Sequence, residues 1–267
     1  MADMQLNDGR SMPALGLGTY QVPDSQAAAV VRQGLDLGYR LIDTAALYGN
    51  ERGVGEGLAG EEDAFVTTKL WNDRHGDAAT ALEESLALLG LEAVDLYLIH
   101  WPAPAQNRYL RAWEALIAAR ERGLVRSIGV SNFAPEHLDR IVEATGVAPA
   151  VNQIELHPSF QQRELRAYHE ARGIVTQSWS PLGQGGDILR EPAIARVAEK
   201  QDASPAQVIL AWHLHHGLSP IPKSADPGRM AENLAALEVR LDEEDVAAID
   251  ALDSADGRIG PDPRTSD

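Results

Sequence analysis

The sequence of 267 residues contains no cysteine. This absence excludes disulfide bonds, a thiolate nucleophile, an iron–sulfur cluster and cysteine-ligated zinc. Positive charge is scarce as well, since 23 Lys and Arg stand against 40 Asp and Glu and the formal net charge is −17. A surface that binds nucleic acid needs a basic face, so we expect no nucleic-acid partner. Hydrophobic residues make up 44% of the chain and charged residues 24%, which is typical of a folded globular protein.

Long hydrophobic runs are also missing. Residues 1–9 carry two aspartates and no apolar stretch, so we expect no signal peptide. The longest segment without a charged residue, 203–222, is interrupted by Pro205, Gly217 and Pro220. It is predicted as a buried helix followed by a turn and a strand, not as a membrane span. We therefore expect a cytoplasmic protein without a membrane partner.

Short apolar runs, predicted as strands, alternate with longer segments of helical periodicity. From the second to the seventh run, successive starts lie 24 to 32 residues apart, a spacing typical of a βα unit. Eight strands joined through helices favour a closed (β/α)8 barrel, the TIM barrel, over an open doubly wound sheet. No domain boundary is visible, so we expect one domain over 1–267. The predicted strands are 15–19, 41–43, 65–69, 94–100, 126–130, 150–154, 174–178 and 218–221, and the predicted helices include 25–37, 77–89, 109–122, 135–144, 163–171, 192–200 and 205–216.

Additional elements are predicted at both ends of the chain. Residues 4–13, with an Asn-Asp-Gly turn, are predicted as an N-terminal β-hairpin that can plug one end of the barrel. Near the C-terminus, Asp242 is predicted to cap a helix, and 253–267 is predicted as a surface loop. Asp24 is expected to cap the helix over 25–37 in the same way.

Polar side chains leave three consecutive predicted strands at the end where such barrels place their chemistry. Asp43 ends the second strand and Tyr48 follows five residues later, while Lys69 and His100 end the third and the fourth. A lysine ammonium lowers the pKa of a nearby tyrosine, and an aspartate can hold that ammonium in place. A neutral histidine can orient a carbonyl oxygen. The set predicts a proton donor for an oxygen that gains negative charge when its carbon receives a hydride.

Lysine is rare in this chain, and its positions are informative. Lys69, Lys200 and Lys223 are the three lysines, and arginine serves as the ordinary cation. Lys223 follows the eighth predicted strand, with Ser224 and Arg229 just beyond it, where a helix is predicted to begin. Phosphate sites in these barrels lie in the loops after strands seven and eight, at a helix N-terminus. These three residues are candidates for clamping a phosphate, and a solvated loop is the equally weighted alternative.

The exit of the seventh predicted strand carries Trp179, followed by a loop with Gly183, Gly185 and Gly186. Glycine lets the backbone approach a pyrophosphate closely, and the indole of Trp179 offers a flat face to a planar ring. The loop therefore predicts a binding site for a ligand with both parts. A flexible lid is the alternative interpretation.

Two further patterns are rejected as sites. Residues 55–60 match G-x-G-x-x-G, but they follow no predicted strand, open no predicted helix and include Glu56, which would repel a phosphate. His213, His215 and His216 have no carboxylate ligand at a matching spacing. We therefore predict no metal site.

In their order along the chain, these residues resemble the aldo-keto reductases, and in particular the bacterial enzymes similar to 2,5-diketo-D-gluconate reductase. The resemblance implies a (β/α)8 barrel that uses NADPH, without a metal, to reduce an aldehyde or ketone to an alcohol by hydride transfer. Diketo-sugar acids and small carbonyl compounds are the implied substrates, and a monomer is the implied state. The motifs that carry the resemblance are Gly16-Leu17-Gly18-Thr19, Asp43-Thr44-Ala45, Tyr48-Gly49-Asn50-Glu51, Thr68-Lys69-Leu70-Trp71, Ile99-His100-Trp101-Pro102, Gly129-Val130-Ser131-Asn132-Phe133, Ile221-Pro222-Lys223-Ser224 and Gly260-Pro261-Asp262-Pro263.

The resemblance also implies a role for each residue that matches the family's catalytic pattern. Tyr48 would be the proton donor. Lys69, salt-bridged to Asp43, would lower the pKa of Tyr48. His100 would position the substrate carbonyl.

For the cofactor, the resemblance implies four groups of residues. Ser131, Asn132 and Gln153 would hold the carboxamide of nicotinamide, and Trp179 would stack on its ring. Ser180, Leu182 and Gly183 would contact the pyrophosphate, with Gln184 as a weaker candidate. Lys223, Ser224 and Arg229 would bind the 2′-phosphate and so favour NADPH over NADH. Glu232 and Asn233 would lie on the adenine side. For the substrate, Tyr20, Trp71 and Trp101 are the expected pocket walls.

Two other functions are weighed against the reductase. A catalytically weak, NADPH-binding regulatory protein on the same fold would be indicated by the loss of a catalytic residue, but Asp43, Tyr48, Lys69 and His100 are all present. A metal-assisted hydrolase would need carboxylate and histidine ligands at several strand exits, where only Asp43 and His100 qualify.

Overall fold

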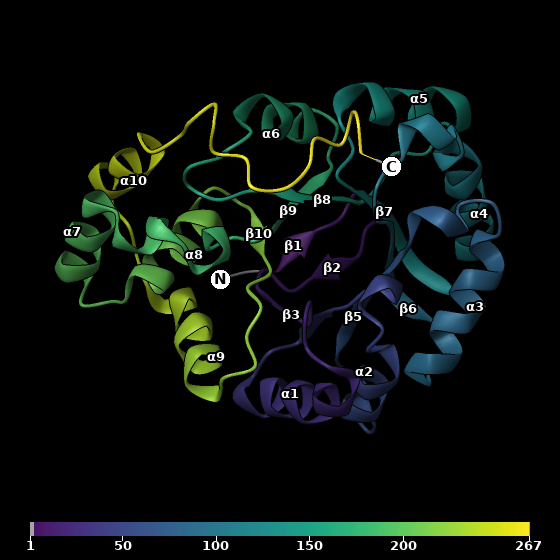
Figure 1. The fold of residues 1–267 in the computed structure, drawn as a ribbon, viewed down its shortest axis with the longest axis horizontal. Coiled ribbons are helices and arrows are strands. Elements are labelled where there is room, and N and C mark those ends of the chain that lie inside the picture. Colours follow the sequence, from purple (N-terminus) through teal and green to yellow (C-terminus); the bar gives the residue numbers. More distant parts are fainter. Residues whose placement is uncertain (1–2, 267) are drawn as a thin grey trace.

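The computed structural model describes residues 3–266, in which eight parallel strands form one sheet that follows the order of the chain (Figure 1). The two outer strands approach each other, since the Gly18 backbone N–H donates to the Pro222 carbonyl at 3.1 Å and Gly18 forms a parallel bridge with Lys223. The sheet is thus a nearly closed barrel, which confirms the predicted fold. Its strands are β3 (Gly16–Gly18), β4 (Leu41–Asp43), β5 (Phe65–Leu70), β6 (Val94–Ile99), β7 (Val125–Ser131), β8 (Val151–Glu155), β9 (Val175–Trp179) and β10 (Ser219–Pro220).

The helices form a ring outside the strands (Figure 1). Most lie where the periodicity predicts them, and α8 and β10 occupy the uncharged segment 203–222, with Val208–Leu214 buried throughout. Within the described residues no helix is long and apolar enough to cross a membrane. The helices are α1 (Asp24–Leu37), α2 (Glu51–Leu58), α3 (Ala78–Leu89), α4 (Tyr109–Glu121), α5 (Pro135–Thr145), α6 (Arg163–Glu170), α7 (Pro192–Gln201), α8 (Pro205–His215), α9 (Pro227–Leu234) and α10 (Glu243–Asp250).

The caps of two helices differ in how well the sequence predicts them. Asp242 caps α10 as expected, since its side chain accepts a hydrogen bond from the Asp245 backbone N–H. The expectation that Asp24 caps the first helix is wrong, because Pro23 occupies the N-cap position and Asp24 is already helical. Its Oδ1 instead accepts the backbone N–H of Gly53 at 2.8 Å. This carboxylate therefore links α1 to α2.

Helix α2 is absent from the predicted helices, although it directly follows the loop that holds Tyr48. Its glycines suggest a loop in the sequence, but here they allow close packing between helices. A Cβ on Gly53 would lie 2.3 Å from the Asp24 carbonyl oxygen, and a Cβ on Gly55 would lie 2.3 Å from the Leu89 carbonyl oxygen. The G-x-G-x-x-G pattern thus lies within and just after α2, as a packing feature between α1 and α3.

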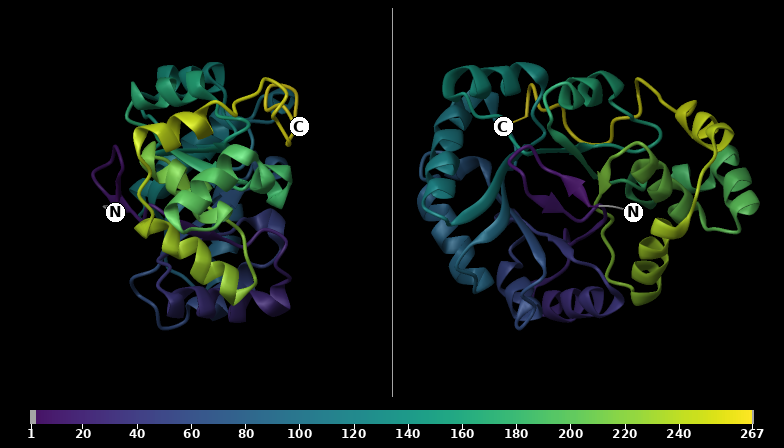
Figure 2. Two further views of the ribbon diagram at one scale, coloured as in Figure 1. Left: turned by 90° about the vertical axis from the view of Figure 1, so that its left-hand side faces the viewer. Right: turned by 180° about the vertical axis from the view of Figure 1, so that it is seen from behind.

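The predicted N-terminal hairpin is formed by β1 (Met4–Gln5) and β2 (Ser11–Met12), which pair antiparallel. Leu6 and Met12 are buried against the first residues of barrel strands, including Leu41, Phe65 and Val151. The hairpin therefore plugs the N-terminal end of the barrel. In Figure 2 it projects on one side of the molecule and the C-terminal tail lies on the other. The tail therefore lies at the end of the barrel where the strands exit and where the predicted site residues are.

Candidate active site

The side chains predicted to carry out chemistry meet where β4, β5 and β6 end. Lys69 is completely buried, and its Nζ donates to Asp43 Oδ1 at 2.6 Å and to the Thr44 carbonyl oxygen at 2.9 Å. The third contact of this ammonium is the hydroxyl of Tyr48 at 3.4 Å. Tyr48 itself ends a short 3₁₀ turn, Ala46–Tyr48, that follows β4. The three hydrogens of the ammonium therefore each have an oxygen to bind, and one of these is the tyrosine hydroxyl.

The charges at this centre are set by burial and by the Asp43–Lys69 pair. Burial opposes the charge on Lys69, but Asp43 and Tyr48 raise the pKa of Lys69 above its ordinary value, so the ammonium stays charged. The ring of Tyr48 is only half-buried, yet its hydroxyl lies against the buried Lys69, and burial raises the pKa of Tyr48 by more than Lys69 lowers it. Lys69 thus lowers the pKa of Tyr48 as expected, but burial outweighs this effect, and the pKa of Tyr48 stays above its ordinary value. The phenol keeps its proton at neutral pH, beside a cation that stabilises its anion.

His100 is the third component of this centre. Its ring lies edge-on to Tyr48, with centroids 5.8 Å apart, and edge-on to Trp71 at 5.2 Å. Burial and then the charge of Lys69 lower the pKa of His100 well below its ordinary value, so the imidazole is neutral. Its Nδ1 is buried and has no hydrogen-bond partner in the described part of the chain. The tautomer with the proton on Nε2 is favoured, since it buries no unpaired N–H.

Polar side chains at the ends of β7 and β8 bind one another in a layer next to this centre. The Ser131 hydroxyl donates to the Gln153 carbonyl oxygen at 2.8 Å, and Asn132 Nδ2 donates to Ser131 Oγ and to the His100 carbonyl oxygen, both at 3.0 Å. Trp179 Nε1 donates to Asn132 Oδ1 at 2.8 Å. All four residues predicted to face nicotinamide are thereby connected to one another and to the His100 backbone.

Gln153 connects this layer to the catalytic pair. Its Nε2 donates to Asp43 Oδ2 at 2.8 Å and to Gln177 Oε1 at 2.8 Å. Asp43 is thus held by Lys69 through one oxygen and by Gln153 through the other. In the structure the side chain of Gln153 therefore orients the aspartate, in addition to any contact that it makes with a ligand.

The loop after β9 turns through several residues in the left-handed region of backbone conformation. Ser180, Gly183 and Gln184 have positive φ angles of 48°, 55° and 58°. Ser180, Leu182 and Gly183 are half-buried, and Gln184 is exposed. A Cβ on Gly183 would lie 2.9 Å from Ile188 Cγ2, so glycine is required there for space as well as for its φ angle.

The loop after β10 presents cations at the start of α9. Lys223 and Arg229 are exposed, and neither pairs with an acidic side chain among residues 3–266. Ser224 is buried, and its hydroxyl donates to the Asp226 carbonyl oxygen at 3.2 Å. Asp226 also caps α9 by accepting the Arg229 backbone N–H at 2.9 Å. The helix N-terminus is therefore already occupied by a carboxylate, and an anion here would be held mainly by the two cationic side chains.

The two residues predicted for the adenine side lie further along the same helix. Glu232 is half-buried, whereas Asn233 is only 4% exposed. Glu232 is therefore accessible to a ligand from solvent, and the side chain of Asn233 is largely enclosed by the protein.

Two of the three expected pocket walls, Tyr20 and Trp71, contact the rings of Tyr48 and His100. Tyr20 is 52% exposed and its ring lies 5.2 Å from that of Tyr48, while Trp71 contacts His100. Trp101 is half-buried and follows His100 in the chain, without an aromatic contact to either ring in the described structure. The access to the Tyr48 hydroxyl is thus lined by aromatic rings from the loops after β3 and β5.

Asn50, which is not among the predicted site residues, fixes the conformation of the loop that carries Tyr48. This buried side chain accepts the Thr44 hydroxyl at 2.7 Å and donates to the carbonyl oxygens of Thr19 and Val22 at 2.9 and 3.0 Å. It thereby fastens the loop after β4 to the loop after β3. Its place in the Tyr48-Gly49-Asn50-Glu51 motif was the available signal.

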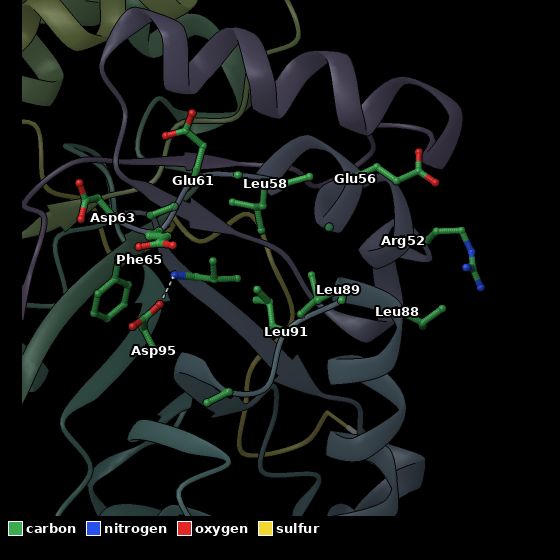
Figure 3. Close-up of a pocket in the computed structure, with 18 of the residues that line it drawn as sticks. Arg52, Glu56, Leu58, Glu61, Asp63, Phe65, Leu88, Leu89, Leu91 and Asp95 are labelled. Atoms are coloured by element: carbon green, nitrogen blue, oxygen red, sulfur yellow. Dashed lines mark hydrogen bonds between the residues drawn. The ribbon is translucent and has the colours of Figure 1, made fainter.

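A cavity of about 920 Å³ lies elsewhere, between the ends of α2 and α3 and the start of β5. Figure 3 shows Arg52 and Glu56 on one side of it and Asp63 and Asp95 on the other, around leucine side chains. None of the predicted site residues lines this cavity. It therefore belongs to the N-terminal end of the barrel and not to the site at the strand exits.

Comparison with known proteins identifies the family. The sequence model described as the aldo/keto reductase family matches residues 14–254. The chain belongs to the aldo-keto reductase family. It is 48% identical over 265 residues to the methylglyoxal reductase DkgA of Yersinia pestis, covering 97% of this chain and 95% of the relative. It is 46% identical to the methylglyoxal reductase DkgA of Escherichia coli (strain K12), covering 97% and 96%.

Solved structures agree with the family assignment. A crystal structure of a Gox0644 variant in complex with NADPH has a TM-score of 0.98 and 50% sequence identity to this aldo-keto reductase, covering all of this chain and 98% of that one. The predicted family, the barrel fold and the oxidoreductase class are therefore confirmed.

Proposed function

We propose that this aldo-keto reductase reduces a small 2-oxoaldehyde such as methylglyoxal, with Tyr48 as the proton donor. As a member of its family the chain is an NADPH-dependent oxidoreductase. The observation that carries the proposal is the buried Lys69, which binds Asp43 at 2.6 Å and the Tyr48 hydroxyl at 3.4 Å, next to the neutral His100.

Tyr48 supplies the proton in this scheme. Its phenol is protonated at neutral pH, so it can give a proton to a carbonyl oxygen that becomes negative. The Lys69 ammonium at 3.4 Å stabilises the tyrosinate that remains, and Asp43 keeps the ammonium in place. Solvent then returns a proton to the tyrosinate. The bound NADPH supplies the hydride that the carbonyl carbon receives.

His100 orients the carbonyl in this scheme. A neutral imidazole with its proton on Nε2 donates a hydrogen bond to the carbonyl oxygen, and this bond strengthens as the oxygen gains charge. The lowered pKa of His100 keeps the ring from competing with Tyr48 as the acid. The different environments of Tyr48 and His100 thus make Tyr48 the proton donor and His100 the hydrogen-bond donor to the carbonyl.

Several features of the protein fit NADPH as the ligand at the strand exits. Trp179 is half-buried and leaves part of its indole available for stacking, beside the layer formed by Ser131, Asn132 and Gln153. In the loop after β9, Ser180, Leu182 and Gly183 are half-buried and so leave part of their surface available to the pyrophosphate.

The cations at the end of the site fit the 2′-phosphate. Lys223 and Arg229 are exposed and unpaired with acids in the described chain, so they are available to a phosphate dianion. Ser224 and Asn233 are largely buried, which makes their predicted contacts weaker proposals than that of Glu232.

The proposed substrate class rests on the access route and on the relatives. The aromatic side chains of Tyr20 and Trp71, with Trp101 next to His100 in the chain, offer an apolar surface to a small carbonyl compound. Relatives 46% to 48% identical over nearly the whole chain are named methylglyoxal reductases. A diketo-sugar acid, with several hydroxyls and a carboxylate, finds fewer polar partners on these rings.

The test is a steady-state comparison of methylglyoxal and 2,5-diketo-D-gluconate with NADPH, following loss of NADPH absorbance. We expect kcat/KM for methylglyoxal to exceed that for the sugar acid at least about tenfold, since one polar mismatch is worth about 1.4 kcal/mol or more. A higher value for the sugar acid would overturn the substrate and leave the reductase intact. Failure to reduce either compound, with NADPH bound, would favour the catalytically weak binding protein.

Other predictions from the sequence stay predictions. They are a single domain over 1–267, a monomer, a cytoplasmic location, and the absence of nucleic-acid and membrane partners.

A further inference from the structure

The C-terminal tail is fastened to the barrel by a buried carboxylate outside the catalytic set. Glu155, the last residue of β8, is 1% exposed. Its Oε1 accepts the Ile259 backbone N–H at 2.6 Å and its Oε2 accepts the Gly260 backbone N–H at 2.8 Å. Since both oxygens bind successive amides of the tail, they fix its position and its orientation.

The Glu155 carboxylate is charged, as an acceptor of two backbone N–H groups should be. Burial opposes the charge on Glu155, but His157 and the two backbone N–H groups lower the pKa of Glu155 below its ordinary value. His157 Nε2 lies 3.2 Å from Glu155 Oε1, the oxygen that also accepts the Ile259 backbone N–H. Glu155 therefore acts as an acceptor for both tail amides near neutral pH.

The fastened part of the tail lies against Trp179. Glu155 and Trp179 are register partners on the adjacent strands β8 and β9. A Cβ on Gly260 would lie 2.7 Å from Trp179 Cη2 and 3.0 Å from Glu155 Oε2. The φ angle of Gly260 is not positive, so this position needs glycine for space alone. The backbone of Gly260 thus closes on the six-membered ring of the indole.

The indole is consequently held at two opposite edges. At one edge Trp179 Nε1 donates to Asn132 Oδ1 at 2.8 Å, and at the other Gly260 limits the movement of the ring. A ring that is fixed at both edges presents its face in one orientation, which lowers the cost of ordering it when a planar ligand stacks on it.

We propose that Glu155 and Gly260 are positioning residues, which set the orientation of Trp179 through the C-terminal tail and so strengthen binding of the nicotinamide. This inference rests on the proposed stacking of Trp179 on that ring. It assigns the tail a role in cofactor affinity that acts through the edge of the indole next to Gly260 and requires no contact between the tail and the cofactor.

Gly260→Ala is the direct test, because it adds only the methyl group that lacks space. We expect the Kd for NADPH, measured by titration calorimetry, to rise about tenfold. Gly76→Ala is the matched control, since Gly76 has a φ angle open to any residue and nothing within 4 Å of its Cβ position. We expect no change in Kd for that variant.

Glu155→Gln tests the two hydrogen bonds between Glu155 and the tail without adding volume. The new amide places an NH2 group opposite one of the two tail amides, so we expect a rise in Kd similar to that of Gly260→Ala and faster hydrogen exchange at Ile259 and Gly260. Glu136→Gln is the control, since Glu136 binds Arg264 of the tail at 2.9 Å on the surface, where both side chains are about half exposed. A loosened tail end should leave the NADPH affinity unchanged.

A double-mutant cycle separates this inference from the proposed stacking. Trp179→Ala alone should raise the Kd for NADPH about tenfold, as expected for one stacked base. In that background, Gly260→Ala should change the Kd by less than about twofold, because its effect runs through the indole. If Trp179→Ala weakens binding but Gly260→Ala and Glu155→Gln do not, the positioning role is overturned and the stacking stands. If Trp179→Ala has no effect, the stacking and the positioning role both fail.

Discussion

Replacing Asp43 by asparagine isolates the electrostatic part of the catalytic centre. Asp43 binds the completely buried Lys69 through Oδ1 and accepts Gln153 Nε2 through Oδ2, at 2.6 and 2.8 Å. In Asp43→Asn one amide oxygen still accepts from Lys69. The new NH2 group, however, faces Gln153 Nε2, so two donors oppose each other, and the buried ammonium has lost its countercharge.

The cost of this change follows from the burial of the pair. Breaking a buried ion pair by removing one partner costs about 3–5 kcal/mol, against a total stability of about 5–15 kcal/mol for a folded domain. With a hydrogen bond to Lys69 retained, we expect about 3 kcal/mol, or a fall in Tm of roughly 6–12 °C. We also expect kcat to fall, because Lys69 loses the group that keeps it charged beside Tyr48.

The assay is urea unfolding at neutral pH, followed by tryptophan fluorescence, together with NADPH-dependent turnover. The double variant Asp43→Asn with Lys69→Met removes both charges, so it should regain most of the stability while turnover stays low. A single variant within about 1 kcal/mol of the native protein would refute the reasoning. So would a double variant no more stable than the single one, since the cost would then not come from an unpaired charge.

Two further predictions concern the cofactor and acid stability. Lys223→Ala combined with Arg229→Ala should raise the Kd for NADPH about 100-fold, because two charge-assisted contacts to the 2′-phosphate are lost. The Kd for NADH, measured by the same calorimetric titration, should rise less than about threefold. An equal rise for both cofactors would place the 2′-phosphate elsewhere. Burial lowers the pKa of six histidines, and it lowers that of His75, His169 and His213 to about 3 or 4, so the unfolded chain binds protons near pH 6.5 that the folded chain does not. The free energy of unfolding should therefore decrease as the pH is lowered below about 6.5, by about 2 kcal/mol at pH 5 for each of these three histidines. A urea midpoint that stays constant from pH 7.5 to 5 would contradict this. The three pKa values are about 4 for His75 and about 3 for His169 and His213.

The barrel could be predicted because its elements have local signals. Most strand residues are buried, most strands begin with apolar residues such as Leu41 and Phe65, and polar residues such as Asp43 and Lys69 lie at or near their ends. Helix α2 was missed because Gly53, Gly55 and Gly57 lower its helix propensity, and only the packing against α1 and α3 shows why glycine is there. The cap predicted at Asp24 is wrong because the partner of Asp24, the Gly53 backbone N–H, belongs to α2, which the sequence does not predict.

The residues that form the candidate site could be predicted from the sequence, but their pKa values could not. The residue types and their strand exits indicate which side chains meet, whereas the balance of burial against charge at Tyr48 depends on how deeply Lys69 lies. The contact of Glu155 with the Gly260 amide spans 105 residues and involves backbone N–H groups, which no sequence pattern identifies. Asn50 is a similar case, since its partners are mainly carbonyl oxygens of another loop.

The central claim is that Tyr48 donates the proton during NADPH-dependent carbonyl reduction, and single-turnover reduction of methylglyoxal by Tyr48→Phe tests it most directly. The variant keeps the ring and removes only the hydroxyl, so NADPH should bind with an unchanged Kd while the rate of NADPH oxidation falls about 100-fold to 10,000-fold. Tyr168→Phe is the matched control, because the Tyr168 hydroxyl binds Asp139 on the outside of the barrel. A rate for Tyr48→Phe equal to that of the native enzyme would contradict the account and assign the proton to another group.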